Sequence, residues 1–272
     1  MPMTYEEFNE NRKGHNCIWL HQEDMDIGGG KISFEDIDRI NQYDNIDKVM
    51  ISGLRQDTFE YFVKKYGNKI KFINFFKNKL VEDFSPLSSL TKVRNISFFH
   101  NQRVTKLWDM SSNRNLEGLS IDDFSRLHSL DGIQTAPQLK HLHFGDRVWL
   151  TSTLNDLIPL TETRLVSFSF FGKNIVKNDI SIYTKMLKLK FLDFPPKFYT
   201  TEQLAQIVAS RPDISGNALV PYIKFDDELS NGEDVLICGK RKPFLNSKKD
   251  AVKIKAYADQ FYQLVEQYKP KK

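Results

Sequence analysis

The sequence has few of the features that mark a secreted, membrane-spanning or metal-binding protein. Its 272 residues include only two cysteines, Cys17 and Cys238, which lie far apart and form neither a C-x-x-C motif nor a disulfide framework. The first residues, MPMTYEEFNENRK, lack the apolar core of a signal peptide, and no apolar run approaches the length of a membrane span. We therefore expect a cytoplasmic protein in a reducing compartment, without a membrane segment.

Motifs for catalysis and for cofactors are also scarce. The run Gly28-Gly29-Gly30-Lys31 resembles a phosphate-binding loop, but Met25 stands where the first glycine is needed and Ile32 replaces the Ser or Thr. No set of a nucleophile, a base and a stabilising group emerges from the sequence. We expect no cofactor and no enzymatic activity.

One acidic segment has the outline of a calcium-binding loop. Asp24, Asp26 and Glu35 are spaced like EF-hand ligands, and Gly29 takes the place of the sharp turn. Gly28, however, contributes no side-chain oxygen, and no helix is predicted before Asp24. An acidic loop that leads into a short helix is the favoured interpretation, and calcium binding is the alternative.

Charge is distributed unevenly, although the formal net charge is only +4. Residues 1–45 carry ten acidic and four basic side chains, whereas residues 240–272 carry ten basic and three acidic ones. Two solvated ends of opposite sign are the favoured interpretation, and a basic tail that meets an anionic partner is the alternative. The tail lacks the interleaved aromatic residues of a single-strand-binding groove, so nucleic acid is not the expected partner.

A repeat of 23 to 26 residues runs through the middle of the chain. Seven segments follow the pattern apolar-x-x-apolar-x-apolar, and they are IDKVMI (46–51), IKFINF (70–75), VRNISF (93–98), LEGLSI (116–121), LKHLHF (139–144), LVSFSF (165–170) and LKFLDF (189–194). A repeat of this length that opens with L-x-x-L-x-L is typical of leucine-rich repeats. Such repeats stack into a solenoid with a parallel sheet on its concave face and short helices or turns on its convex face. We expect an α/β protein of this kind with N- and C-terminal caps.

The segment between two of the predicted strands supports a more specific resemblance. Residues 81–91, VEDFSPLSSLT, resemble the convex half of bacterial, internalin-like leucine-rich repeats, which often have the sequence I-x-D-I-S-P-L-x-x-L-T. The resemblance extends over residues 46 to about 215. It implies the architecture and leaves the partner open, because leucine-rich repeats bind many different partners.

The residue that follows each strand by three positions varies along the array. Leucine-rich repeats usually place an asparagine there, and Asn78 and Asn101 take that place in the second and third repeats. Such an asparagine can bond neighbouring backbone groups and extend a ladder between coils. The next three repeats have Phe124, Arg147 and Lys173 instead, so we expect the ladder to be interrupted.

The segment before the repeats is expected to cover one apolar end of the array. Residues 1–45 form the predicted N-terminal capping segment, and the repeat domain of about seven repeats covers residues 46–215. CIWL at 17–20 is predicted to add an edge strand, and Ser33 is predicted to open an amphipathic helix.

The pattern changes after the repeats, and residues 216–272 are predicted to form a cap or a small module. Strands on either side of Asn231-Gly232 are predicted to form a hairpin. A helix with one apolar face is predicted over residues 248–268.

The residues between the apolar positions of each strand point to the concave side. The chain has 21 phenylalanines, and several of them fall on this side. Exposed aromatic groups that gather on one surface usually mark an interface. The alternative is that the terminal segments fold over some of these rings. The predicted partner-binding residues are Phe72, Asn74, Phe76, Phe99, Asp122, His141, His143, Phe171 and Phe191.

The histidines on the fifth repeat offer one further hypothesis. His141 and His143 alternate on one strand and could share a metal, with Asp122 of the preceding repeat as a third ligand. A surface pair without a metal is the favoured interpretation, and such a pair could make ligand binding sensitive to pH.

These patterns predict a non-enzymatic scaffold that binds a protein or peptide partner on its concave face. Phenylalanines would serve as apolar anchors, and the polar residues beside them would provide selectivity. The alternative is a structural or regulatory module in which residues 222–272 contact the partner and the repeats act as a spacer.

Overall fold

The computed structural model describes residues 16–22 and 31–270. The chain forms two compact units that part between Asn178 and Asp179, and each is described by itself. This division lies inside the predicted repeat domain, residues 46–215. The predicted boundaries after residues 45 and 215 remain predictions.

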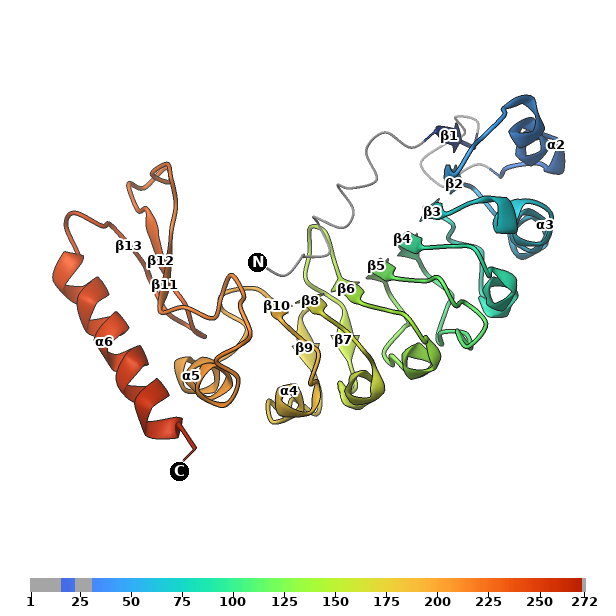
Figure 1. Ribbon diagram of the computed structural model, residues 1–272. Helices are drawn as coiled ribbons and strands as arrows, with labels where there is room; N and C mark the ends of the chain where they lie inside the picture. Colours follow the sequence, from blue (N-terminus) through green and yellow to red (C-terminus); the bar gives the residue numbers. More distant parts are fainter. Residues whose placement is uncertain (1–15, 23–30, 271–272) are drawn as a thin grey trace. The chain divides into compact units, whose positions relative to one another are not determined.

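The first unit contains most of a large parallel β-sheet, which confirms the predicted α/β class (Figure 1). Its strands follow one another in chain order, and each of the first six predicted strand segments holds one of them. The seven strands that this unit contributes to the sheet are β1 (Cys17–Leu20), β2 (Lys48–Ser52), β3 (Phe72–Phe76), β4 (Asn95–Asn101), β5 (Gly118–Phe124), β6 (His141–Gly145) and β8 (Ser167–Phe171). Two short strands, β7 (Thr153–Leu154) and β9 (Asn174–Ile175), pair with each other in a separate parallel sheet. β1 pairs with β2 in parallel, so the predicted edge strand is confirmed.

The apolar consensus positions of the repeat form the core of this unit. Two rows of side chains run across paired strands, one from Val49 to Phe168 and one from Ile51 to Phe170. Every member of both rows is at most 2% exposed. Because side chains alternate along a strand, the residues between these positions lie on the opposite face of the sheet. We call this the strand face.

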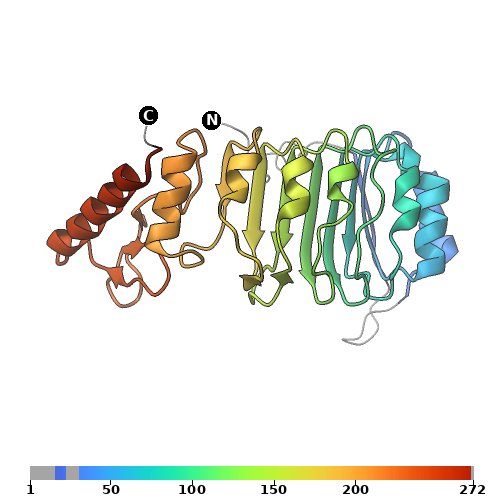
Figure 2. The ribbon, with the colours of Figure 1, turned by 90° about the horizontal axis from the view of Figure 1, so that it is seen from below.

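Helical return segments cover the core side of the sheet, as Figures 1 and 2 show. The longest is α3 (Gln56–Tyr66), whose apolar face buries Phe59, Phe62 and Val63. Later returns are short 3₁₀ turns, namely η3 (Ser85–Ser89), η4 (Ile133–Thr135) and η5 (Ile158–Glu162). We call a strand together with its return segment a coil.

The predicted helix after Ser33 is present as α2 (Phe34–Asp38), followed by the 3₁₀ turn η1 (Arg39–Gln42). Ser33 Oγ accepts a hydrogen bond from the Asp36 amide, and the Asp36 carboxylate accepts one from the Ser33 amide. This reciprocal capping explains why the helix begins there.

Near the end of each of four consecutive strands, one residue adopts the left-handed backbone conformation and changes the direction of the chain. Gly53, Lys77, His100 and Asp123 have φ angles of 76°, 54°, 61° and 57°. Three of them are not glycines, so the repeat imposes this conformation on residues that rarely adopt it. The turn aims the next residue, which is Asn78 or Asn101 in two coils, back toward the core.

The second unit combines two short elements with a small antiparallel sheet and two longer helices. It contains α4 (Ile182–Lys185), β10 (Phe191–Asp193), α5 (Thr201–Ser210), β11 (Tyr222–Lys224), β12 (Val235–Ile237), β13 (Phe244–Leu245) and α6 (Ala251–Tyr268). β11 and β12 pair around Asn231-Gly232, which confirms the predicted hairpin. The predicted final helix is confirmed as well, although it begins at Ala251 rather than at residue 248.

The cysteines and the helices were used above to predict the compartment, and the structure describes both. Both cysteines are free thiols, and burial raises the pKa of the Cys238 thiol to about 12, so this thiol is unreactive at neutral pH. Across residues 16–22 and 31–270, no helix combines the length and the apolar character that crossing a bilayer requires.

Candidate functional site: a polar and aromatic strand face

The strand face displays three columns of side chains, because consecutive strands pair without any shift in register. The register places the predicted residues in the columns expected from the repeat. The first column is Lys48, Phe72, Asn95, Gly118, His141 and Ser167; the second is Met50, Asn74, Ser97, Ser120, His143 and Ser169; the third is Ser52, Phe76, Phe99, Asp122, Gly145 and Phe171.

An aromatic stack occupies the third column on β3 and β4. The rings of Phe76 and Phe99 stack with their centroids 5.0 Å apart, and both are partly exposed. Each ring of the stack is in contact with a cation: Lys77 Nζ lies 5.3 Å from the Phe76 centroid, and the Arg147 guanidinium lies 4.6 Å from that of Phe99. Cation–π contacts of this kind orient both the ring and the charge.

An ionic cluster continues the same column on β5 and β6. The Asp122 carboxylate is buried; it accepts hydrogen bonds from Ser120 Oγ at 3.0 Å and His143 Nε2 at 3.0 Å, and Arg147 Nη2 lies 3.5 Å away. Burial acts to raise the pKa of Asp122, but His143, Arg147 and Ser120 outweigh it, so the pKa lies below its ordinary value. The His143 ring in turn stacks on Phe171 with centroids 5.9 Å apart. Through Arg147 and through His143 of the second column, the side chains from Phe76 to Phe171 form one connected row, which we call the strand-face row.

The cluster holds a serine, an aspartate and a histidine, but not in the order that nucleophilic catalysis needs. A base must take the hydroxyl proton, and the acid must orient that base from the far side. Here Ser120 Oγ donates to Asp122, and His143 contacts the same carboxylate. This geometry fixes the carboxylate rather than activating the serine.

His141 lies apart from this cluster although it is only two residues from His143. It is buried, and its Nδ1 lies 2.8 Å from Ser167 Oγ. Burial, assisted by the Lys140 charge, lowers the pKa of His141 to about 4, so the ring is neutral at pH 7. Within the described part of the chain, no group of three or more His, Cys, Asp or Glu side chains is arranged to hold a metal. The metal hypothesis thus gains no support from the geometry.

The other residues that were predicted to bind a partner or calcium do not join the strand-face row. Phe72 was expected on the open surface but is only 4% exposed. Asn74 is partly buried in the second column, and its Oδ1 has no hydrogen-bond partner among the described residues. Phe191 belongs to β10 in the second unit and is partly exposed. Of the hypothetical calcium ligands, Asp24 and Asp26 lie outside the described residues, and Glu35 is an exposed residue in the first turn of α2.

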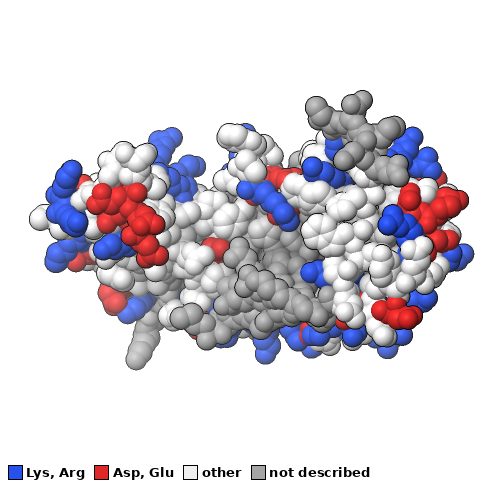
Figure 3. Space-filling view, turned by 90° about the horizontal axis from the view of Figure 1, so that it is seen from above, with Lys and Arg blue, Asp and Glu red and all other residues white. Residues whose placement is uncertain are grey.

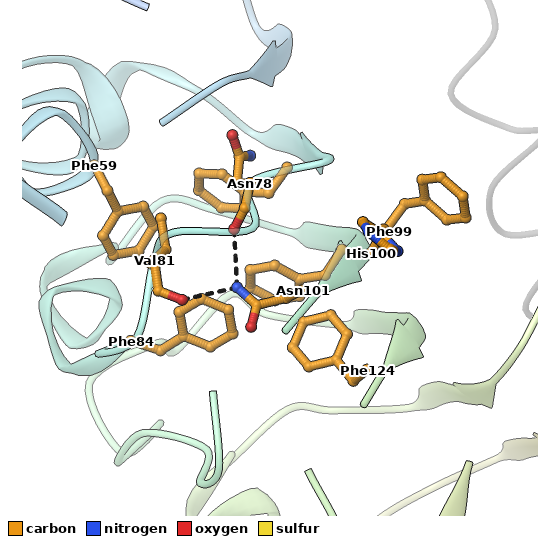
Figure 4. A pocket seen from close by; sticks show the side chains of 10 residues that line it. Phe59, Asn78, Val81, Phe84, Phe99, His100, Asn101 and Phe124 are labelled. Carbon is orange, nitrogen blue, oxygen red and sulfur yellow. Dashed lines mark hydrogen bonds between the residues drawn. The ribbon is translucent and has the colours of Figure 1, made fainter. Parts of the chain in front are cut away.

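The predicted asparagine ladder is present in two coils and lines a small cavity (Figure 4). Asn101 Nδ2 donates to the carbonyls of Asn78 and Val81, at 2.9 and 2.8 Å. Its Oδ1 accepts from the amides of Arg103 and Val104. Phe124 interrupts the ladder in the next coil, as expected. The cavity measures about 10 Å³, less than a bound ligand requires, so this region holds the coils together rather than binding a molecule.

The structure reveals one feature that the sequence patterns missed. Residues 147–150, Arg-Val-Trp-Leu, form an exposed loop after β6, which we call the finger. Val148, Trp149 and Leu150 are 73%, 79% and 42% exposed. From the sequence, the 26-residue spacing of the fifth repeat indicated only a small insertion. The signal was the run of three consecutive apolar residues, Val148 to Leu150, which begins three positions after the strand end.

Charged groups surround this edge of the strand face. Seen from above in Figure 3, Lys and Arg side chains and Asp and Glu side chains both lie along the borders of the first unit on the right, and uncharged side chains form most of the described surface between them. Arg147 connects the finger to the strand-face row, because its guanidinium contacts both Phe99 and Asp122. A comparison with models of known protein families finds no match for the chain, and a comparison with curated proteins finds no significant relative.

Proposed function

We propose that this protein is a leucine-rich-repeat solenoid, without enzymatic activity, that binds a protein or peptide partner along its concave strand face. The observation that carries the proposal is the strand-face row. Phe76, Phe99 and Phe171 are partly exposed on the open side of the sheet, while the chain has other phenylalanines to fill its core. Aromatic residues at such positions are the usual anchors of interfaces.

Along the strand-face row, apolar groups are followed by polar groups, which suits a partner that carries both kinds of side chain. The aromatic stack on β3 and β4 offers apolar ring surface, and Asp122 with His143 and Arg147 offers fixed polar groups one strand further on. The row follows consecutive strands, which lie about 4.8 Å apart in a parallel sheet. An extended segment that crosses the strands would meet both kinds of group, with an apolar side chain on the stack and a hydrogen-bonding group near Asp122.

The proposal is tested with ligands selected against the whole chain. Peptides displayed on phage are selected on the immobilised wild-type protein, and the enriched peptides are measured by isothermal titration calorimetry. Phe99→Ala should weaken binding by about 2 kcal/mol, because truncation of an aromatic anchor typically costs that much. Phe34→Ala is the matched control, since Phe34 is also an exposed ring in contact with another aromatic residue but lies on α2.

Equal affinities of the two variants for the selected peptides would contradict binding on the strand face. Failure of the selection to enrich any peptide would remove the support for a peptide-binding surface. Circular dichroism on each variant separates loss of binding from loss of folding.

A second candidate function places the partner on the second unit. Helix α6 exposes Val252 and Tyr262, at 84% and 57%, although both are apolar enough to be covered in a partner complex. Tyr262→Ala, measured with the same peptides, distinguishes the two candidates. Loss of affinity in this variant and not in Phe99→Ala would favour the second unit.

A further inference from the structure

A cavity lies between the segment that leads into β2 and the segment that leads into β3, which contains the 3₁₀ turn η2 (Gly67–Lys69). Its volume is about 350 Å³, within the range of about 300 to 1,000 Å³ that small-molecule sites usually have. Three isoleucines line it, together with Asn41, Tyr43, Asp44, Asn45 and Lys69. We call it the edge cavity.

Asparagines close the gaps between the next coils at the same edge. Asn68 Nδ2 donates to the Ser89 carbonyl at 2.9 Å, and Asn68 Oδ1 accepts the Thr91 amide at 2.8 Å. One coil further, Asn115 Nδ2 donates to the Thr91 carbonyl at 2.7 Å. In the second repeat Lys69 has the place of Asn115, directly before the first apolar position of the strand segment, and it forms no hydrogen bond or ion pair with any described residue. The first gap therefore stays open.

Polar side chains around the edge cavity have hydrogen-bonding capacity that the described part of the chain does not use. Asp44, Asn45 and Lys69 are exposed, and none of these three side chains forms a hydrogen bond or ion pair with another described residue. The Lys69 ammonium lies 5.8 Å from the centre of the Tyr66 ring, and Asn41 Nδ2 donates to Tyr66 Oη at 2.7 Å. Because Tyr66 is buried, it fixes where both of these donors lie.

We propose that the edge cavity binds a neutral carbohydrate of one or two sugar units. The carboxylate of Asp44 and the ammonium of Lys69 have opposite charges, so together they favour a ligand without net charge. A sugar hydroxyl both donates and accepts hydrogen bonds, and the cavity offers a carboxylate that accepts, an ammonium that donates and amides that do both. The hydrogen bonds to the two charged groups would be the stronger ones.

The aromatic residue of the lining suits a sugar as well. The Tyr43 side chain is 51% exposed and borders the same cavity. A pyranose has a face of C–H groups, which packs against the electron-rich face of an aromatic ring. A free amino acid is the competing ligand. Its two charges are attached to one carbon, whereas Asp44 and Lys69 come from different coils and form no ion pair with each other, which suits the separate hydroxyls of a sugar better.

The experiment uses the full chain and simple sugars. The methyl glycosides of glucose, galactose, mannose and N-acetylglucosamine are tested by saturation-transfer difference NMR, and isothermal titration calorimetry gives the dissociation constant of each one that binds. At least one glycoside should receive saturation from the protein. Glycine, serine and glutamine, tested in the same way as zwitterions, should receive none.

Two variants of the cavity lining should weaken binding, and each has a matched control. Lys69→Ala should raise the dissociation constant of the bound glycoside by about tenfold or more, because it removes a charged hydrogen-bond donor. Lys92→Ala should leave it unchanged, since Lys92 is exposed and stands directly before Val93 as Lys69 stands before Ile70, but in a gap that is closed. Tyr43→Ala should weaken binding to a similar degree, and Tyr262→Ala, which removes another exposed tyrosine, should not.

The proposal is overturned if none of the four glycosides binds, or if the amino acids bind in their place. Unchanged affinity in both Lys69→Ala and Tyr43→Ala, with circular dichroism showing that the variants are folded, would also overturn it. Phe99→Ala should bind the glycoside as the wild type does, and loss of binding in that variant would place the sugar on the strand face instead. The peptide-binding proposal is measured with different ligands and stands or fails separately.

Discussion

The two faces of the parallel sheet in the first unit differ sharply, although they are built from alternate residues of the same strands. The core face has an apolar side chain at the same places in every coil, and every member of its two rows is at most 2% exposed. The strand face changes from aromatic on β3 and β4 to ionic on β5 and β6. Regularity on one face specifies the architecture, and variation on the other provides the chemistry by which a partner could be distinguished.

Phe98→Ala and Phe99→Ala test this comparison most strongly, because the two residues are adjacent in sequence and lie on opposite faces. Phe98 is buried and stacks on Phe75 and Phe84, so its truncation should lower the free energy of unfolding by about 4 kcal/mol. Phe99→Ala should cost less than about 1 kcal/mol of stability. Urea titrations of both variants provide the measurement. Similar losses would mean that the two faces are not energetically distinct.

A second pair of variants compares an asparagine of the buried ladder with an asparagine of the strand face. Asn101→Ala should destabilise the protein by about 3 kcal/mol, because it leaves two carbonyls of the preceding coil and two amides of its own coil without these partners. Asn74→Ala on the strand face should change stability by less than about 1 kcal/mol, since its Oδ1 has no hydrogen-bond partner among the described residues. Thermal unfolding of both variants is the appropriate assay. A larger loss for Asn74→Ala would reverse the comparison.

A pH titration examines the buried histidine of the strand face. The pKa of His141 is lowered to about 4 in the folded protein, mainly by burial, whereas it is near 6.5 in the unfolded chain. Between these values the unfolded state binds more protons, so stability should fall as the pH decreases from 6.5 to 4, by on the order of 2 to 3 kcal/mol. His141→Gln should flatten this part of the profile of unfolding free energy against pH. An unchanged slope in the variant would assign the pH dependence to other groups.

The smallest effect on stability is expected at the finger. Trp149→Ala should alter the free energy of unfolding by no more than about 0.5 kcal/mol, because the side chain is 79% exposed. Asp146→Ala is the informative companion, since it removes the carboxylate that closes the loop and should cost about 2 kcal/mol. A large loss in Trp149→Ala would mean that the indole packs against the protein.

The parts of this structure that the sequence predicted are those in which apolar residues recur at a short, regular spacing. Alternation within the L-x-x-L-x-L segments identified the strands, their buried positions and the columns of the strand face, because a period of two determines which face each side chain takes. The Asn231-Gly232 turn and the apolar face of the last helix were recognisable for similar local reasons. Exposure was harder to predict. Asp122 and His141 were expected to face a partner, yet both are buried. Ser120 of the same strand and His143 of the next strand contact Asp122, and Ser167 of the adjacent strand contacts His141.

The finger could not be predicted in the same way, because it depends on contacts between coils. Asp146 forms its capping bonds only when the loop folds back on itself, and Arg147 reaches Phe99 and Asp122 across two strands. Neither relation has a fixed spacing in the sequence. The connection between Ser120 and Asp122 is local, but its partner His143 comes from the next strand, so the ionic cluster was also invisible as a unit.

The asparagine ladder has a consequence for protein engineering. In the second and third repeats the turn after the strand has a fixed length, because Asn78 and Asn101 must reach particular carbonyls and amides of the preceding coil and, for Asn101, of its own coil. The fifth repeat has Arg147 in that place and is the longest of the array, with 26 residues. A foreign sequence grafted between Arg147 and Thr151 would be displayed on a closed loop, whereas the same graft after Asn78 would break buried bonds. The array thus contains its own insertion point, at a coil that lacks the ladder asparagine.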